Sequence, residues 1–168
     1  DLVGFHPDQP VSFSKNIGPG RFARPEGLSV PDTGAKASVA ADVDADGDVD
    51  FVIVSKSHEL KWLRNDGNSG FQTIHLGNAV LPLFTIFQDL PVLADLDSDG
   101  DLDILVPNDG RLESYTQVSP GVFAFDGVKA DPGTTFRGYA VADFDTDGVP
   151  DIVVGASVTT GSGNSTLR

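Results

Sequence analysis

A nine-residue pattern, Asp-x-Asp-x-Asp-Gly-x-x-Asp, occurs three times in this chain of 168 residues, at 42–50, 95–103 and 143–151. In each copy, acidic residues alternate around a glycine, which permits a tight turn. Carboxylates placed in this way surround a small space with oxygen atoms, and hard divalent cations, Ca²⁺ above all, bind such oxygens. The pattern therefore predicts three cation-binding loops in a fold that repeats about every 50 residues.

The formal net charge of −14 comes from 25 acidic and 11 basic residues. Fourteen of the acidic residues lie in the three loops, so the remaining 11 balance the 11 Lys and Arg residues. The acidity is thus concentrated in the loops rather than spread over a solubilising surface. Such a chain is a poor partner for nucleic acid or an anionic membrane, and no apolar run approaches the roughly 18 residues of a spanning helix. We expect neither nucleic-acid binding nor membrane insertion.

The sequence around the loops predicts short strands. A short apolar segment precedes each loop, and a β-branched apolar run such as 51–54 follows it. Two further strand-like segments, 60–64 and 71–76, flank a turn rich in Gly and Asn, and no helical periodicity is sustained. Four antiparallel strands repeated about every 50 residues are typical of β-propeller blades, so we predict an all-β fold.

The repeat also predicts how the chain is divided. We expect residues 1–168 to form a single β-propeller segment of about three and a half blades, with units near 1–37, 38–90, 91–137 and a partial unit at 138–168. Asp1 matches the last position of a fourth motif, and the chain contains no Met. We therefore interpret the chain as a processed product or a portion of a longer chain. The remaining blades would come from the parent chain or from other copies.

Two small features recur at each loop. Alanine precedes all three loops, and the second loop position is apolar: Val43, Leu96 and Phe144. We expect the alanine to fit a crowded inner strand and the apolar residue to anchor the loop from beneath.

The loops differ from other calcium-binding motifs. An EF-hand requires an acidic ligand at its twelfth position and helices on both sides. Counting twelve from each first Asp gives Ile53, Val106 and Val154, which are apolar. The chain has no Cys, which excludes Cys-linked calcium repeats, disulfides and thiolate chemistry.

The three loops, the apolar run after each loop and the segment 151–156 resemble the FG-GAP/VCBS repeats of integrin-α-like β-propellers. The resemblance implies a propeller, most often seven-bladed, with one Ca²⁺ in each loop, or about three ions. Carried over by position, the side-chain ligands would be Asp42, Asp44, Asp46 and Asp50; Asp95, Asp97, Asp99 and Asp103; and Asp143, Asp145, Asp147 and Asp151. The seventh position would contribute its backbone carbonyl, from Asp48, Asp101 and Val149. Gly47, Gly100 and Gly148 would turn the backbone inside the cage.

No catalytic or second cofactor site is predicted. His6, His58 and His75 are scattered, and Gly161-Ser162-Gly163 lacks the Lys-Ser/Thr that follows a phosphate-binding loop. We expect His58 to be solvated in a turn. Aromatic residues such as Trp62 and Tyr115 fit core packing between blades better than sugar stacking.

The resulting hypothesis is a non-enzymatic, calcium-stabilised module for protein–protein interaction or adhesion. Extracellular modules bind Ca²⁺ with dissociation constants of about 10⁻⁴–10⁻³ M, so we expect an extracellular, secreted or periplasmic location; the Asn164 sequon is compatible with secretion. Two alternatives remain open: a lectin-like propeller that binds glycans through Trp62, and an accessory domain of a secreted polysaccharide-acting enzyme.

Overall fold

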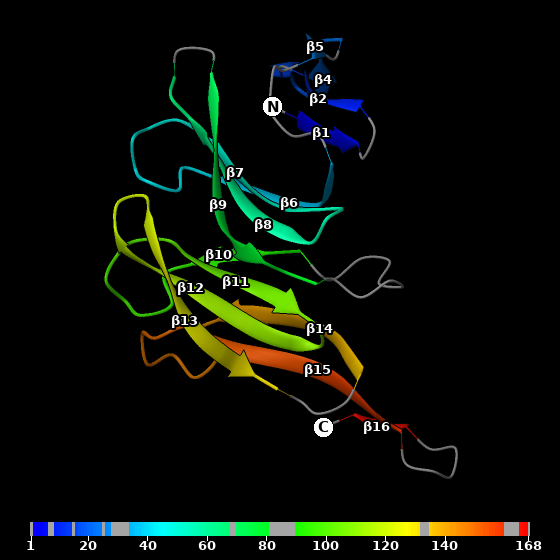
Figure 1. Ribbon diagram of the computed structural model, residues 1–168, viewed down its shortest axis with the longest axis vertical. Helices are drawn as coiled ribbons and strands as arrows, with labels where there is room; N and C mark the ends of the chain where they lie inside the picture. Colours follow the sequence, from blue (N-terminus) through cyan, green and yellow to red (C-terminus); the bar gives the residue numbers. More distant parts are fainter. Residues whose placement is uncertain are drawn as a thin grey trace.

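Figure 1 shows the computed structural model of the chain, which is built from strands. The structure describes residues 2–6, 9–14, 16–24, 26–27, 34–67, 70–80, 90–131, 135–159 and 165–167. No helix occurs among these residues. The strands are β1 (Leu2–His6), β2 (Gln9–Ser14), β3 (Asn16–Gly18), β4 (Arg21–Phe22), β5 (Glu26–Gly27), β6 (Ala35–Ala41), β7 (Asp50–Ser55), β8 (Glu59–Asn65), β9 (Phe71–Asn78), β10 (Val92–Ala94), β11 (Asp103–Asn108), β12 (Arg111–Ser119), β13 (Val122–Ala130), β14 (Thr135–Ala142), β15 (Asp151–Thr159) and β16 (Ser165–Leu167).

Three consecutive sheets carry the acidic loops. The first repeat sheet is β6-β7-β8-β9 and the second is β10-β11-β12-β13, each four-stranded, with neighbouring strands antiparallel. The third repeat sheet is β14-β15-β16, while β1-β2-β5 and the β3-β4 hairpin precede the first. The all-β class and the four-stranded antiparallel units predicted from the sequence are confirmed.

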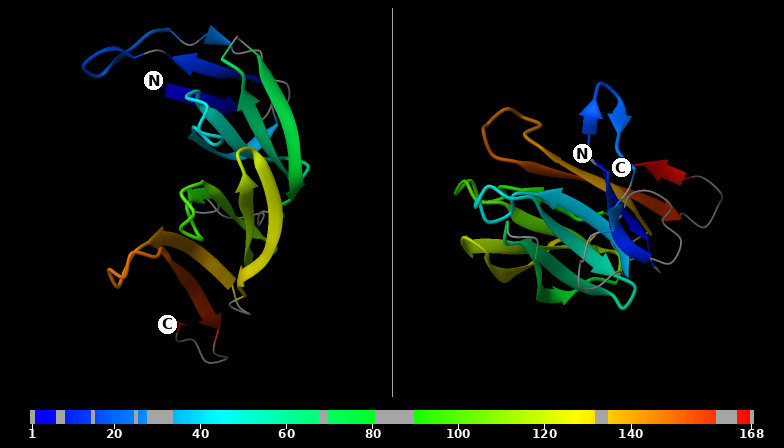
Figure 2. Two further views of the ribbon diagram at one scale, coloured as in Figure 1. Left: turned by 90° about the vertical axis from the view of Figure 1, so that its left-hand side faces the viewer. Right: turned by 90° about the horizontal axis from the view of Figure 1, so that it is seen from above.

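The sheets follow one another along an arc in chain order (Figure 2). Strand β1 contacts β6, and β6 contacts β10, so the first strands of successive sheets are neighbours. The connections β6–β7, β10–β11 and β14–β15, which contain the acidic motifs, all lie on the same side of the arc (Figure 1). This arrangement is that of successive propeller blades.

The second strands of the first two repeat sheets, β7 and β11, are buried on both faces because neighbouring sheets cover them. All six residues of β7 are buried. Val52 and Val54 pack with Ile104 and Val106 of β11 between the first and second repeat sheets. The alternate residues of β7 join a separate cluster on the opposite face. The apolar run that follows the loop in the sequence thus fills two cores at once.

The third repeat sheet has one face that no described sheet covers. In the first repeat sheet, the corresponding face contributes Val43 and Val52, which are 2% and 0% exposed. The equivalent residues of the third repeat sheet, Phe144 and Val153, are 55% and 48% exposed. The expectation that Phe144 anchors its loop from beneath is therefore wrong for the described residues, because no described sheet packs against this face.

Candidate metal centres

Each acidic loop joins the same pair of strand ends. Ala41 pairs with Asp50, Ala94 with Asp103 and Ala142 with Asp151, so three hairpins of identical register close the loops. The alanine before each loop and the aspartate at its ninth position are thus directly opposite each other. The structure places strands rather than helices on both sides, which agrees with the exclusion of an EF-hand.

Hydrogen bonds inside the loops repeat with nearly the same geometry. The backbone N–H of the sixth-position glycine donates to the first-position aspartate at 3.0, 3.0 and 2.9 Å in the three loops. The N–H of the seventh residue donates to the fifth-position aspartate at 3.0, 2.9 and 2.8 Å. These bonds hold each backbone in a fixed turn before any ligand is considered.

The turn uses two left-handed residues, of which the sequence indicated one. Gly47, Gly100 and Gly148 have φ angles of 96°, 96° and 90°, as predicted for the sixth position. The fourth position is also left-handed, although it carries no glycine: φ is 58°, 63° and 66° at Ala45, Ser98 and Thr146. Such angles are strained for residues with a Cβ, and most of all for β-branched threonine. The only feature of the sequence that pointed to a left-handed fourth position was the small size of the residues found there.

Three carboxylates converge in each loop. In the first two loops these are positions one, three and five, and in the third loop positions one, three and nine, with ligand atoms within 4.8 Å of one another. The converging residues are Asp42, Asp44 and Asp46; Asp95, Asp97 and Asp99; and Asp143, Asp145 and Asp151. Asp147, at the fifth position of the third loop, is not among the converging residues, although it accepts the N–H of Val149 as Asp46 and Asp99 accept the equivalent N–H groups in their loops.

The donor atoms fit a hard cation. In the first loop, Oδ1 of Asp42 and Oδ1 of Asp44 are buried and have no hydrogen-bond partner. Burying a carboxylate oxygen without a partner is unfavourable. A divalent cation bound among these oxygens would give both of them a partner, and its coordination chemistry requires oxygen donors of this type.

The ninth-position aspartates Asp50 and Asp103 are buried and fix the loop to its sheet. Asp50 Oδ2 accepts the N–H of Val43 at 3.2 Å, and its Oδ1 accepts the N–H of Asn65 at 2.7 Å. Asp103 repeats both bonds with Leu96 and Gln117, at 2.8 Å each. Burial raises the pKa of both carboxyls, while these N–H donors oppose the shift. Their side chains therefore connect the loop to the third strand of its sheet.

At the seventh position, Asp48 and Asp101 are half-buried and Val149 is exposed. The Asp48 carboxylate lies against Gly67 in the turn after β8, where a Cβ would approach its Oδ2 to 2.4 Å. The side chain at the seventh position thus has different surroundings in different loops.

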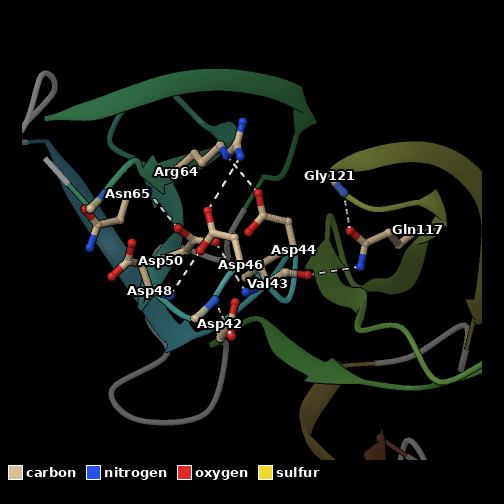
Figure 3. Close-up of polar contacts among 12 residues, drawn as sticks. Asp42, Val43, Asp44, Asp46, Asp48, Asp50, Arg64, Asn65, Gln117 and Gly121 are labelled. Atoms are coloured by element: carbon tan, nitrogen blue, oxygen red, sulfur yellow. Dashed lines mark hydrogen bonds and ion pairs between the residues drawn. The ribbon is translucent and has the colours of Figure 1, made fainter.

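An arginine enters the first loop, although an isolated arginine in a sequence is usually a solvated surface residue (Figure 3). Arg64, near the end of β8, places Nε 2.7 Å from Asp44 Oδ2 and Nη2 3.5 Å from Asp46 Oδ2. The sequence showed Arg64 only as an isolated arginine, since the hairpin that brings it to the loop is formed by strands β7 and β8.

A second missed residue, Gln117, joins two repeat sheets beside the loops (Figure 3). Its side chain is buried, and Nε2 donates to the carbonyl of Val43 at 3.0 Å and of Leu102 at 3.2 Å. Its Oε1 accepts the N–H of Gly121 at 2.5 Å. Gln117 thus connects the second position of the first loop with the eighth position of the second loop.

The aromatic residues Trp62 and Tyr115 and the histidines considered from the sequence lie outside the acidic loops. Trp62 is 1% exposed and meets the ring of Phe123 edge to face at 5.9 Å, and Tyr115 is also buried. His75 is largely exposed, 3.6 Å from Glu59. His58 is half-buried in its turn rather than fully solvated, and its backbone carbonyl accepts the N–H of Ala79. Asp1, Asn164, Gly161-Ser162-Gly163 and the side chain of His6 lie outside the described residues.

The fold and the loops together define a propeller-type repeat whose strand-to-strand loops are acidic. A model of the FG-GAP-like repeat matches residues 42–106 and 95–154, which together span more than half of the chain. The chain therefore belongs to the FG-GAP-like repeat family. Repeats of this family are typical of extracellular proteins and are generally non-catalytic. A comparison with curated proteins found no match. Among the described residues, no helix has the length and apolar character needed to cross a membrane.

Proposed function

We propose that this chain is a non-catalytic, calcium-stabilised β-propeller module that presents its surfaces for protein–protein interaction or adhesion outside the cell. The observation that carries the proposal is the convergence of three carboxylates in each of three loops that share one backbone conformation. A single acidic turn would be an ordinary surface feature. Three acidic turns with the same register, internal hydrogen bonds and left-handed positions indicate a repeated binding site.

The residues of each loop have separate tasks in this proposal. Positions one, three and five hold the cation through side-chain oxygens, and position seven offers its backbone carbonyl. The ninth aspartate closes the coordination in the third loop, where it already lies with Asp143 and Asp145. In the first two loops the hydrogen bonds of this aspartate fix the loop to the sheet. The bound ion supplies positive charge that offsets the repulsion among the carboxylates.

The proposed location follows from the affinity expected of such loops. Dissociation constants near 10⁻⁴–10⁻³ M suit extracellular calcium and leave a site empty in the cytosol. Repulsion among the loop carboxylates destabilises the folded state when no ion is bound. An ion that binds the folded state in preference to the unfolded state stabilises it by linkage wherever calcium is plentiful.

The uncovered face of the third repeat sheet supports a proposal about partners. Because equivalent faces of the first and second repeat sheets are covered by the next sheet in the chain, we propose that a further repeat sheet covers this one. It comes from the same polypeptide or from a second copy of this chain. Burial of Phe144 and Val153 would supply the hydrophobic driving force.

No described residue favours the glycan-binding alternative. Trp62, the residue on which that alternative depended, is packed in the core and offers no ring face to a sugar. The alternative of an accessory domain in a polysaccharide-acting enzyme depends on other parts of such a protein.

Isothermal titration with Ca²⁺ tests the proposal when applied to matched variants. Asp97→Asn preserves shape but removes one converging carboxylate, so we expect it to lose about one ion per chain relative to wild type. Asp109→Asn makes the same change in an exposed turn at a left-handed φ of 47°, which Asn tolerates, and should keep full stoichiometry. Full stoichiometry in Asp97→Asn would refute the ligand assignment.

A further inference from the structure

The first loop differs from the second in having a positive charge supplied by the chain itself. The guanidinium of Arg64 contacts the carboxylates of Asp44 and Asp46, two of the three that converge there (Figure 3). Asp44 is the more enclosed of the two, with a side chain only 5% exposed. An ion pair that is this sheltered is screened by solvent far less than one on an open surface.

The position of Arg64 is set by its surroundings. It extends from β8, where the preceding Leu63 and Trp62 are buried. Its Cζ lies 5.9 Å from the centre of the Trp62 ring, within the range of a cation–π interaction. The following residue, Asn65, is tied to Asp50 through its backbone N–H. The ring of Trp62 and the backbone bond of Asn65 to Asp50 therefore direct the guanidinium into the loop.

The second loop provides an internal comparison. The N–H of Asn65 bonds Asp50, and the N–H of Gln117 bonds Asp103, so these residues are equivalent in the two sheets. The residue before each is Arg64 in one sheet and Thr116 in the other. The hydroxyl of Thr116 donates to Asp126 of β13, so this position adds no positive charge to the second loop.

We infer that Arg64 sets the cation affinity of the first loop, because its guanidinium and a divalent ion compete for the Asp44 and Asp46 carboxylates. This inference rests on the calcium-binding function proposed above. The first loop binds Ca²⁺ more weakly than the second, either by repulsion between ion and guanidinium or by the cost of breaking the ion pair. In return, the first loop is charge-compensated and keeps its conformation at calcium concentrations where the second loop is unoccupied.

The single tryptophan makes the first loop separately observable. Trp62 and Asp44 both lie against Gly121, whose added Cβ would come within 2.8 Å of Trp62 Cη2 and 3.7 Å of Asp44 Cβ. Tb³⁺ is a luminescent substitute for Ca²⁺, and excitation of tryptophan at wavelengths where tyrosine does not absorb sensitises an ion bound nearby. This signal is therefore weighted toward the first loop, beside which Trp62 lies, while calorimetry reports the sum of all loops.

The test compares three variants of the full chain with wild type. Arg64→Gln removes the charge, and we expect the half-saturating Tb³⁺ concentration at the first loop to fall about tenfold or more. Thr116→Arg places the charge beside the second loop, and calorimetry with Ca²⁺ should show one of the tighter sites weakened. Arg111→Gln removes an exposed arginine paired with Asp131 and should leave both signals unchanged.

Melting curves exclude a merely structural role for Arg64. Arg64→Gln should melt below wild type in EGTA, since the loop has lost its counter-charge, yet gain more in melting temperature than wild type on adding Ca²⁺. An unchanged or raised Tb³⁺ half-saturation in Arg64→Gln, with normal calcium binding elsewhere, would overturn this inference and leave the proposed function standing. Absence of ion binding in wild type and all variants would overturn both.

Discussion

At the scale of single residues, the buried ammonium of Lys61 is matched by a specific carboxylate. Lys61 is 4% exposed in β8, and its Nζ lies 2.7 Å from Glu59 Oε2. Ser57 also donates to this oxygen, at 2.6 Å. The Lys61 ammonium and then the Ser57 hydroxyl lower the pKa of Glu59 to about 2. The ionised form of Glu59 is therefore favoured by folding.

This pair predicts a pH dependence. Because the folded pKa of Glu59 lies below its unfolded value of about 4.5, its contribution to stability is present above that value and is lost as the pH falls toward 2. Glu59→Gln should lower the free energy of unfolding at neutral pH and leave Lys61 buried without its carboxylate. Urea unfolding of both proteins at a series of pH values should show their difference shrinking between these two pKa values. A difference that stays constant over this range contradicts the assignment.

At the scale of elements, the repeat sheets are joined by side chains beside the loops as well as by apolar packing. Asn65 and Gln117 occupy equivalent positions, and each donates to the carbonyl at the eighth position of its own loop, Val49 or Leu102. Gln117 is longer by one methylene and reaches Val43 of the preceding sheet as well. With one more methylene, Gln117 thus adds a bond between sheets to the bond within its own sheet.

Gln117→Ala should lower the free energy of unfolding by about 1–3 kcal/mol, because it leaves buried carbonyls without a donor. Gln117→Asn should cost less, since Asn in the equivalent position of the first repeat sheet keeps the bond within its own sheet. Gln72→Ala, at an exposed site in β9, is the control and should have little effect. Denaturant unfolding measures all three, and equal stability of Gln117→Ala and Gln72→Ala would refute the role given to Gln117.

The sequence predicts the elements well, because their signals are local. Alternating aspartates, sixth-position glycines and apolar runs each determine local structure within a few residues. The hairpins form at the positions that these patterns predict. Arg64 and Gln117 have no such signal. Gln117 meets Val43 across 74 residues of sequence, and a lone glutamine in a strand is indistinguishable from a solvated one until the sheets are stacked. Likewise, the left-handed fourth position carries residues that rarely adopt that conformation.

At the scale of the whole molecule, the arc ends in the exposed apolar face of the third repeat sheet. Val153 in β15 is the equivalent of Leu105, which is 1% exposed, and of Val52, which is 0% exposed. Large apolar side chains left exposed on a sheet face in this way favour association. In a solution of this chain alone, we propose that a second copy covers the face, in a head-to-tail contact rather than a two-fold one.

Val153→Asp should therefore abolish concentration-dependent self-association, since it places a charge at the centre of the contact. Val128→Asp is a matched control, because Val128 is equally exposed, at 48%, but lies on β13 away from this face. Sedimentation velocity over a range of concentrations distinguishes them. Association of Val153→Asp at the wild-type level, or a wild type that remains monomeric throughout, contradicts the proposed contact.

The most direct test of the account is the thermal unfolding of the wild-type chain in millimolar Ca²⁺ and in EGTA. Ion binding to three loops stabilises the folded state by mass action, by about 1.4 kcal/mol for each site at tenfold its dissociation constant. For a chain of this size, that predicts a rise in melting temperature on the order of 10 °C. Superimposable melting curves in the two buffers would show that calcium does not hold these sheets together.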